Sequence, residues 1–135
     1  YFRDADGARC ANPYSGAAVD LCLACRSAEA AGPVSFGVII TDTQHLNAKV
    51  VAISSGKDGE WFDIEHGDSE LRVRMPSLNL RPGRYSAKVS VIARPFYTLD
   101  VVEKFVFDVR SDVAFGDSLI HQPREWLVCA REPRT

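Results

Sequence analysis

Side chains suited to binding a sugar recur at regular spacing in the middle of the chain. Sugars present C–H faces that pack on aromatic rings, and hydroxyls that form hydrogen bonds with arginine, lysine and serine. The candidates for carbohydrate binding are Arg72, Arg74, Arg84, Ser86, Lys88, Ser90, Trp61 and Tyr97. Rows of serine, lysine and arginine also cover the surface of any soluble β-sheet, and the sequence leaves open which sheet face would bind.

One acidic stretch could be considered for hydrolytic chemistry. Asp63, Glu65, Asp68 and Glu70 flank His66, and a glycosidase needs two carboxyl groups, one of them with a raised pKa. Glycines in and near this stretch favour a solvated loop instead, where carboxyl groups keep their ordinary pKa. We therefore predict no catalytic residue, and we expect the chain to bind its ligand without transforming it.

The cysteines could in principle hold a metal or form disulfides. Cys22 and Cys25 have the spacing of half a zinc site, but residues three apart on a strand point to opposite faces, and no second pair completes four ligands. Together with Cys10 and Cys129 they are expected to be free thiols in a reducing compartment. We predict no metal and no cofactor in this domain.

Charge and hydropathy argue against nucleic acid as a partner and against a membrane-spanning segment. The formal net charge of −2 and the pI near 5.9 provide no basic surface for a phosphate backbone, so nucleic acid is not an expected partner. No apolar run approaches the roughly 18 residues that cross a bilayer. The start at Tyr1 without methionine and the polar end favour a fragment of a longer polypeptide.

Apolar residues recur at every second position, which is the pattern of strands half-buried between two sheets. Seven segments show this pattern or are rich in β-branched residues: 19–25, 34–41, 48–54, 71–75, 85–93, 105–109 and 126–128. Turn residues separate them, and no segment has a helical stripe. The sequence therefore predicts an all-β fold over residues 1–135, a single antiparallel two-sheet sandwich of the immunoglobulin-like or jelly-roll kind.

The last predicted strand lies far from the others in sequence. A polar tether from Arg110 to Glu125 precedes Trp126, Leu127 and Val128. Such a tether would let residues 111–135 fold back on their own sheet or pair with a second copy in a domain-swapped dimer. The local sequence does not distinguish these alternatives.

Residues 35–42, Ser-Phe-Gly-Val-Ile-Ile-Thr-Asp, and residues 75–85, Met-Pro-Ser-Leu-Asn-Leu-Arg-Pro-Gly-Arg-Tyr, resemble the C-terminal domain of Wzt-type ATPases. These ATPases are the nucleotide-binding subunits of ABC transporters that export O-antigen polysaccharide. Residues 35–42 follow that family's Phe-Gly-hydrophobic-x-hydrophobic-x-Asp strand, and residues 75–85 follow its Pro-x-Leu-x-Leu-x-Pro-Gly-x-Tyr segment. The similarity extends from about Asp4 to Trp126. In this family the domain is a carbohydrate-binding β-sandwich whose glycan contacts vary with the polymer, so no binding residue is carried over.

The resemblance implies a function and a set of partners. The domain would bind the capped, non-reducing end of a lipid-linked O-polysaccharide and select finished chains for export. Its partners would be its own ATPase domain, where ATP binds, a transmembrane transporter subunit and a second copy that exchanges the last strand. It would lie in the cytoplasm, at the inner face of the bacterial inner membrane. The alternative from a different class is an immunoglobulin-like adhesion or protein-interaction domain in an oxidising compartment.

Overall fold

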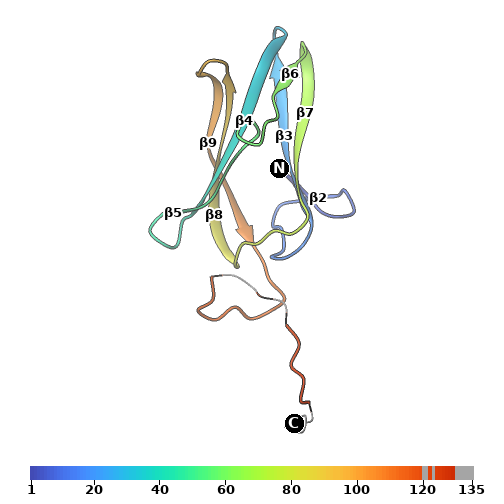
Figure 1. The fold of residues 1–135 in the computed structure, drawn as a ribbon, viewed down its shortest axis with the longest axis vertical. Helices are drawn as coiled ribbons and strands as arrows, with labels where there is room; N and C mark the ends of the chain where they lie inside the picture. Colours follow the sequence, from blue (N-terminus) through green and yellow to red (C-terminus); the bar gives the residue numbers. More distant parts are fainter. Residues whose placement is uncertain (120–121, 123, 130–135) are drawn as a thin grey trace, which may run out of the picture.

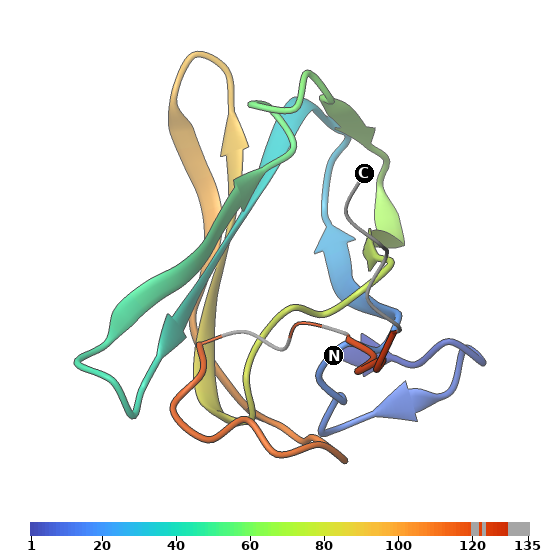
Figure 2. The same cartoon turned by 60° about the horizontal axis from the view of Figure 1, so that its bottom comes forward.

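Two antiparallel sheets face each other in the computed structural model, which describes residues 1–119, 122 and 124–129. Figure 1 shows the sheets edge-on with the chain's C-terminal part below them, and Figure 2 shows the same two layers from another side. The predicted two-sheet sandwich is therefore confirmed. No helix able to cross a membrane occurs in the part of the chain that the structure describes.

The smaller sheet has four strands in the order β2-β1-β3-β7. Their bounds are Phe2–Arg3 for β1, Arg9–Cys10 for β2, Val19–Ser27 for β3 and Gly67–Met75 for β7. β3 and β7 pair along their whole length, from Val19 opposite Met75 to Ser27 opposite Gly67. The β1 strand covers only the first part of β3, so the edge of β3 is free beyond Cys22 within the described residues.

The larger sheet has five strands in the order β5-β4-β8-β9, with β6 also paired to β4. Their bounds are Ala31–Asp42 for β4, Ala48–Ser54 for β5, Phe62–Ile64 for β6, Gly83–Ala93 for β8 and Tyr97–Val109 for β9. Strands β4 and β8 form the centre of this sheet, where Val34 to Asp42 pair with Ala93 to Tyr85.

The core fills the space between the sheets with the residues that the alternation predicted to point inward. Phe107 is 3% exposed and contacts three other rings, with centroid distances of 4.9 Å to Phe2, 5.8 Å to Tyr85 and 5.9 Å to Phe105. Leu78 and Leu80, in the connection between β7 and β8, are also buried. They close one end of the sandwich.

Trp126, Leu127 and Val128 do not form the predicted last strand. Residues 124–129 have no regular structure, and the three side chains are 90%, 71% and 105% exposed. In Figure 1 this part of the chain leads away from both sheets. A strand needs a partner edge for its backbone hydrogen bonds, and in a single copy this segment reaches none. The rest of the predicted tail, residues 130–135, lies outside the described residues.

Buried Tyr85 gives the sandwich a predicted pH dependence. Its hydroxyl donates a 2.7 Å hydrogen bond to the Arg81 carbonyl, and burial, with a smaller contribution from the Asp42 carboxylate, raises its pKa to about 12. Because the unfolded tyrosine ionises near pH 10, the stability that depends on neutral Tyr85 is complete below pH 10 and is lost between about pH 10 and 12.

We expect Tyr85→Phe to remove this component. Chemical denaturation across pH 9–12 should show a steeper loss of stability for the parent protein, by an amount on the order of 3 kcal/mol. Parallel curves for the two proteins would contradict the assignment.

Candidate functional site

The row predicted on β8 lies on the outer face of the five-stranded sheet. Tyr85 and Ala87 are fully buried, so the alternate residues Arg84, Ser86, Lys88 and Ser90 point away from the core. The strand register places residues of β4 and β5 beside them on the same side. We call this surface the β8 face; its residues are Ser35, Gly37, Ile39, Thr41, Ala52, Ser54, Arg84, Ser86, Lys88 and Ser90.

Some charged and hydroxyl groups on the β8 face already form hydrogen bonds or ion pairs within the protein, and others do not. Arg84 donates to both carboxylate oxygens of Asp108 at 3.0 and 3.4 Å, and this hydrogen bonding holds the pKa of Asp108 below its ordinary value. The Lys88 ammonium lies 3.6 Å from the Glu103 carboxylate. Ser86 and Ser90 have no side-chain hydrogen bond within the described residues. Their hydroxyls are therefore the groups that a ligand could engage without breaking an existing contact.

Gly37 keeps the β8 face open at Ser90. The two residues pair across β4 and β8, and a Cβ atom on Gly37 would lie only 2.9 Å from the Ser90 hydroxyl oxygen. Because glycine has no side chain, the Ser90 hydroxyl stays accessible next to flat backbone. This is the kind of surface on which a sugar ring can approach a sheet closely.

Trp61 lies at one end of the β8 face, where it packs against a turn that serine hydroxyls hold in place. The buried Ser35 hydroxyl accepts a 2.9 Å hydrogen bond from the Gly56 amide and lies 3.2 Å from the Ser54 hydroxyl. A Cβ atom on Gly56 would come within 2.9 Å of Cζ2 of Trp61, so only glycine lets the indole pack here. The turn between β5 and β6 thereby sets the position of Trp61 against β4.

Arg94 joins Trp61 to the β8 row. Its guanidinium carbon lies 4.1 Å from the centroid of the Trp61 ring, in the geometry of a cation–π contact. Arg94 follows the end of β8 directly and continues the alternation of Lys88 and Ser90. Sequence analysis did not identify Arg94, although this alternation was a signal for it; it also missed Ser35, Gly37, Ser54 and Gly56.

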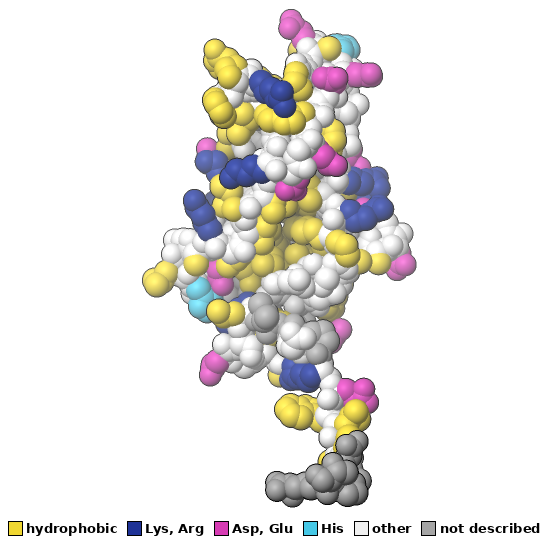
Figure 3. All heavy atoms as spheres, in the orientation of Figure 1, with side chains coloured by type: hydrophobic (Ala, Val, Ile, Leu, Met, Phe, Trp, Pro, Cys, Tyr) yellow, Lys and Arg dark blue, Asp and Glu magenta, His cyan; other side chains and the backbone are white. Residues whose placement is uncertain are grey.

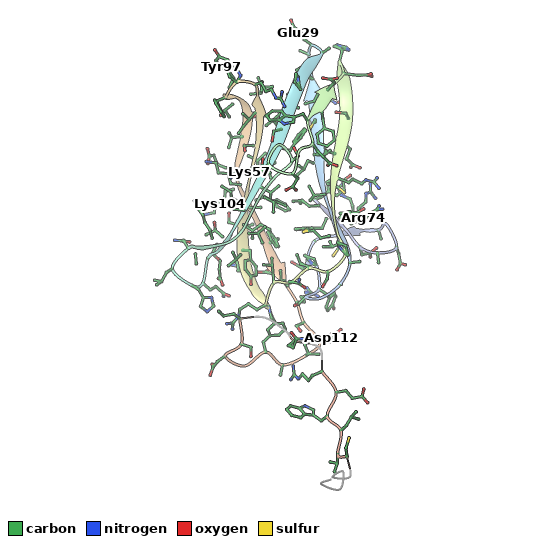
Figure 4. All side chains as sticks on the ribbon, in the orientation of Figure 1. Glu29, Lys57, Arg74, Tyr97, Lys104 and Asp112 are labelled. Atoms are coloured by element: carbon green, nitrogen blue, oxygen red, sulfur yellow. The ribbon has the colours of Figure 1, made fainter. Side chains whose placement is uncertain are left out.

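Arg72 and Arg74 lie on the other sheet. Both project from β7 on the outer face of the four-stranded sheet, where Arg72 bonds Glu70 at 2.7 Å and Arg74 bonds both oxygens of Asp20 at 3.1 and 3.2 Å. Hydrogen bonding to Arg74 also lowers the pKa of Asp20. In Figure 4, Arg74 and Lys104 of β9 lie on opposite sides of the molecule. The predicted residues therefore do not form one surface.

Tyr97 lies away from the β8 face. It begins β9 at the tip of the β8–β9 hairpin, as Figure 4 shows, and it is 67% exposed. It pairs with Ala93, whose side chain packs against the core, so Tyr97 lies on the opposite side of the sheet from Ser90. Of the predicted candidates, the β8 row and Trp61 are brought together, whereas Arg72, Arg74 and Tyr97 are not.

Two carboxyl groups of the acidic stretch accept hydrogen bonds from arginine. Asp68 accepts two hydrogen bonds from Arg26, at 2.7 and 3.3 Å, and Glu70 accepts one from Arg72. Elsewhere in the two sheets, hydrogen bonds from arginine lower the pKa of Asp20 and of Asp108. A catalytic acid requires the opposite shift.

The thiols lie apart from the β8 face. Cys22 is buried and Cys25 is half-buried on β3, and all four cysteines are unpaired. Burial, with the nearby Asp100 carboxylate, raises the pKa of the Cys25 thiol. Within the described ranges no group of three or more His, Cys, Asp or Glu side chains could hold a metal ion.

An apolar cleft opens between the two sheets along β3 and β9. Its volume is about 480 Å³, and Leu21, Leu23, Phe36, Val91 and Phe105 are among the residues that line it. Figure 3 shows hydrophobic side chains exposed in the hollow between the sheets. β9 is the edge strand beside this cleft, and its outer edge has no strand partner within the described part of the chain.

The two facing antiparallel sheets define a β-sandwich domain. The family model of the Wzt C-terminal domain matches residues 1–121, and the chain belongs to this family. Membership indicates a carbohydrate-binding, non-catalytic domain of an ABC transporter. The resemblance found in the sequence is thus confirmed.

The fold also matches a solved member of the family. A structure described as the crystal structure of the C-terminal domain of wzt superposes with a TM-score of 0.76 at 13% sequence identity, covering 94% of this chain and 79% of that one. At this identity the match shows the fold and does not transfer binding residues. A search of curated proteins gave no match.

Proposed function

We propose that this domain binds O-antigen polysaccharide on its β8 face, at the capped non-reducing end, and so selects finished glycan for export by an ABC transporter. The observation that carries the proposal is the grouping on one face of a fixed indole, Trp61, with the unengaged hydroxyls of Ser86 and Ser90 and the Lys88 ammonium. Aromatic C–H packing and hydroxyl hydrogen bonds are the two contacts that a neutral sugar ring requires.

The arrangement fits binding better than hydrolysis. The groups lie along an extended strand, with successive outward side chains about 7 Å apart, so they can contact several positions of a polymer. The two acids beside the β8 row, Asp108 and Glu103, form ion pairs with Arg84 and Lys88. Selection would therefore come from differences in affinity between finished and unfinished ends.

Isothermal titration calorimetry tests this function. The domain is titrated with O-polysaccharides of defined structure, each with its terminal cap intact and with the cap removed. Saturable binding to one polymer that is lost when its cap is removed supports the proposal. Binding that is equal for both forms contradicts end recognition, and absence of binding across a panel that includes the parent strain's own polymer contradicts the function.

The remaining partners follow from the same proposal. The polypeptide that carries this domain would also contain an ATPase domain, where ATP binds, and would associate with a transmembrane subunit at the inner face of the bacterial inner membrane. The lipid-linked glycan would meet the domain there before export. Unpaired thiols at Cys10, Cys22, Cys25 and Cys129 are compatible with this reducing location.

A homodimer would give the exposed C-terminal segment a partner. Trp126, Leu127 and Val128 are apolar and exposed, while β9 has an open edge beside the apolar cleft. We propose that this segment pairs with the open edge in a second copy. Light scattering is expected to give a dimer for the domain and a monomer for a chain truncated after Ser111. A monomer for both would contradict strand exchange.

A further inference from the structure

Arg94 differs from four other outward arginines, which form ion pairs. Arg26, Arg72, Arg74 and Arg84 each bond a carboxylate at 2.7 to 3.1 Å. Arg94 stacks on the Trp61 ring instead, and within the described residues its N–H groups have no hydrogen-bond acceptor and no acidic partner. A guanidinium that stacks through its flat face keeps the N–H groups of its edge available.

The stack is held in place before any ligand arrives. Gly56 packs against Trp61, and the Ser35 hydroxyl fixes the Gly56 amide at 2.9 Å, so the indole has little freedom to move. A guanidinium resting on a fixed ring loses less side-chain entropy when it binds than a free arginine would. Arg94 is thus preorganised as a donor at the end of the β8 face.

The acidic residues of the adjoining turn form no ion pair with Arg94 within the described residues. Asp58 and Glu60 line a hollow at the edge of the two sheets, together with Ser54, Phe62 and Val73. Trp61 and Arg94 are not part of that lining. Figure 4 shows Lys57 of the same turn in front of the larger sheet, and Lys57 has no ion pair within the described residues. Within the described residues, Arg94 therefore forms no ion pair with an acidic side chain.

We infer that Arg94 binds an anionic group of the glycan, a carboxylate or a phosphate, while Trp61 supports its guanidinium. The inference rests on the proposed function and names the class of ligand that this part of the face would take. The planar fork of a guanidinium matches two oxygens of a carboxylate or phosphate, which a single sugar hydroxyl cannot offer. Ser90, about 13 Å away along the strand, would then contact a neighbouring sugar.

Fluorescence of Trp61 reports on this contact directly. The substitution Trp126→Phe removes the other tryptophan, which is 90% exposed and lies outside both sheets. In this background the protein is titrated with methyl glucuronide, methyl phosphate and neutral methyl glucoside. We expect saturable changes with one or both acids, weakened by added salt, and none with the neutral sugar at the same concentrations.

Three variants identify the group responsible. Arg94→Gln should weaken acid binding by about tenfold or more, since a hydrogen-bonded charge pair is lost. Arg94→Lys should retain only part of the affinity, because it keeps the charge and loses the fork. Arg9→Gln is the matched control, since Arg9 also stacks on a ring, that of Tyr1 at 3.9 Å, but lies on the other sheet. Thermal unfolding of each variant checks that it folds.

The outcomes separate this inference from the proposed function. A response to methyl glucuronide alone identifies a carboxylate, and a response to methyl phosphate alone identifies a phosphate; either supports the inference. An unchanged response in Arg94→Gln, or no response to either acid, overturns it. Polysaccharide binding without any preference for acidic polymers would overturn the inference and leave the proposed function standing. Binding of the small acids without binding of any polysaccharide would contradict the proposed function and leave the anion site at Arg94 standing.

Discussion

Replacing Phe107 by alanine is expected to lower the free energy of unfolding by about 3–5 kcal/mol. Phe107 is 3% exposed and contacts Phe2, Tyr85 and Phe105, so its removal leaves a cavity where rings from both sheets meet. Urea denaturation followed by circular dichroism measures the change. Because single domains of this size have a total stability of about 5–15 kcal/mol, this variant should lose a large fraction of its stability.

The neighbouring residue provides the matched control. Val106 precedes Phe107 on β9, points to the opposite face and is 47% exposed. Val106→Ala should change the free energy of unfolding by no more than about 0.5 kcal/mol. Equal destabilisation by the two substitutions would show that the inner face of β9 does not form the core described above.

Replacing Trp61 by alanine is expected to weaken binding of the O-polysaccharide by about 2 kcal/mol, or about 30-fold. The substitution removes the aromatic ring that stacks with Arg94 at the end of the β8 face, and so also removes the support for Arg94. Isothermal titration calorimetry with the polymer that binds the parent protein measures the loss.

Two of the residues predicted from sequence serve as controls for this variant. Arg74→Ala changes a side chain on the other sheet, and Tyr97→Ala changes one at the hairpin tip, so both should leave the affinity within about twofold. Each should alter stability by less than about 1 kcal/mol, because the ion pair of Arg74 and the ring of Tyr97 are exposed. A larger loss of affinity in Arg74→Ala than in Trp61→Ala would move the site to the four-stranded sheet.

The sequence predicted the strands that contribute most to the core. In β3, β4 and β8, apolar residues alternate over seven or more positions, and such a period arises only where one face is buried. The short strands β1, β2 and β6 were not predicted, since two or three residues cannot display an alternation. β9 begins at Tyr97, earlier than expected, because polar residues at 98, 100, 103 and 104 hide the pattern in its first part.

The candidate site was predicted only in part. Alternation correctly showed that Ser86 and Ser90 point outward, but it contains no information about which distant strands share a sheet. Arg72 and Arg84 therefore looked equivalent in the sequence, although β7 and β8 belong to different sheets. The stack of Arg94 on Trp61 depends on the turn at Gly56, a contact between three separate segments that no local pattern records.

The prediction of a last strand at residues 126–128 was wrong for a related reason. The composition of residues 126–128 suits a strand, but a strand forms only where an edge is available to pair with it. Within a single copy the segment stays exposed. The same residues could form a strand against a second copy, so the composition of this segment and its conformation in one chain do not conflict.

Mapping of backbone amide shifts on addition of a capped O-polysaccharide oligosaccharide tests the central claim most directly. The account predicts that the largest ¹H–¹⁵N shift changes fall on the β8 face and its Trp61 end, at Ser35, Gly37, Gly56, Ser90 and Arg94. Shift changes confined to Asp20, Arg72 and Arg74 on the four-stranded sheet would contradict it, and so would an unchanged spectrum at saturating oligosaccharide.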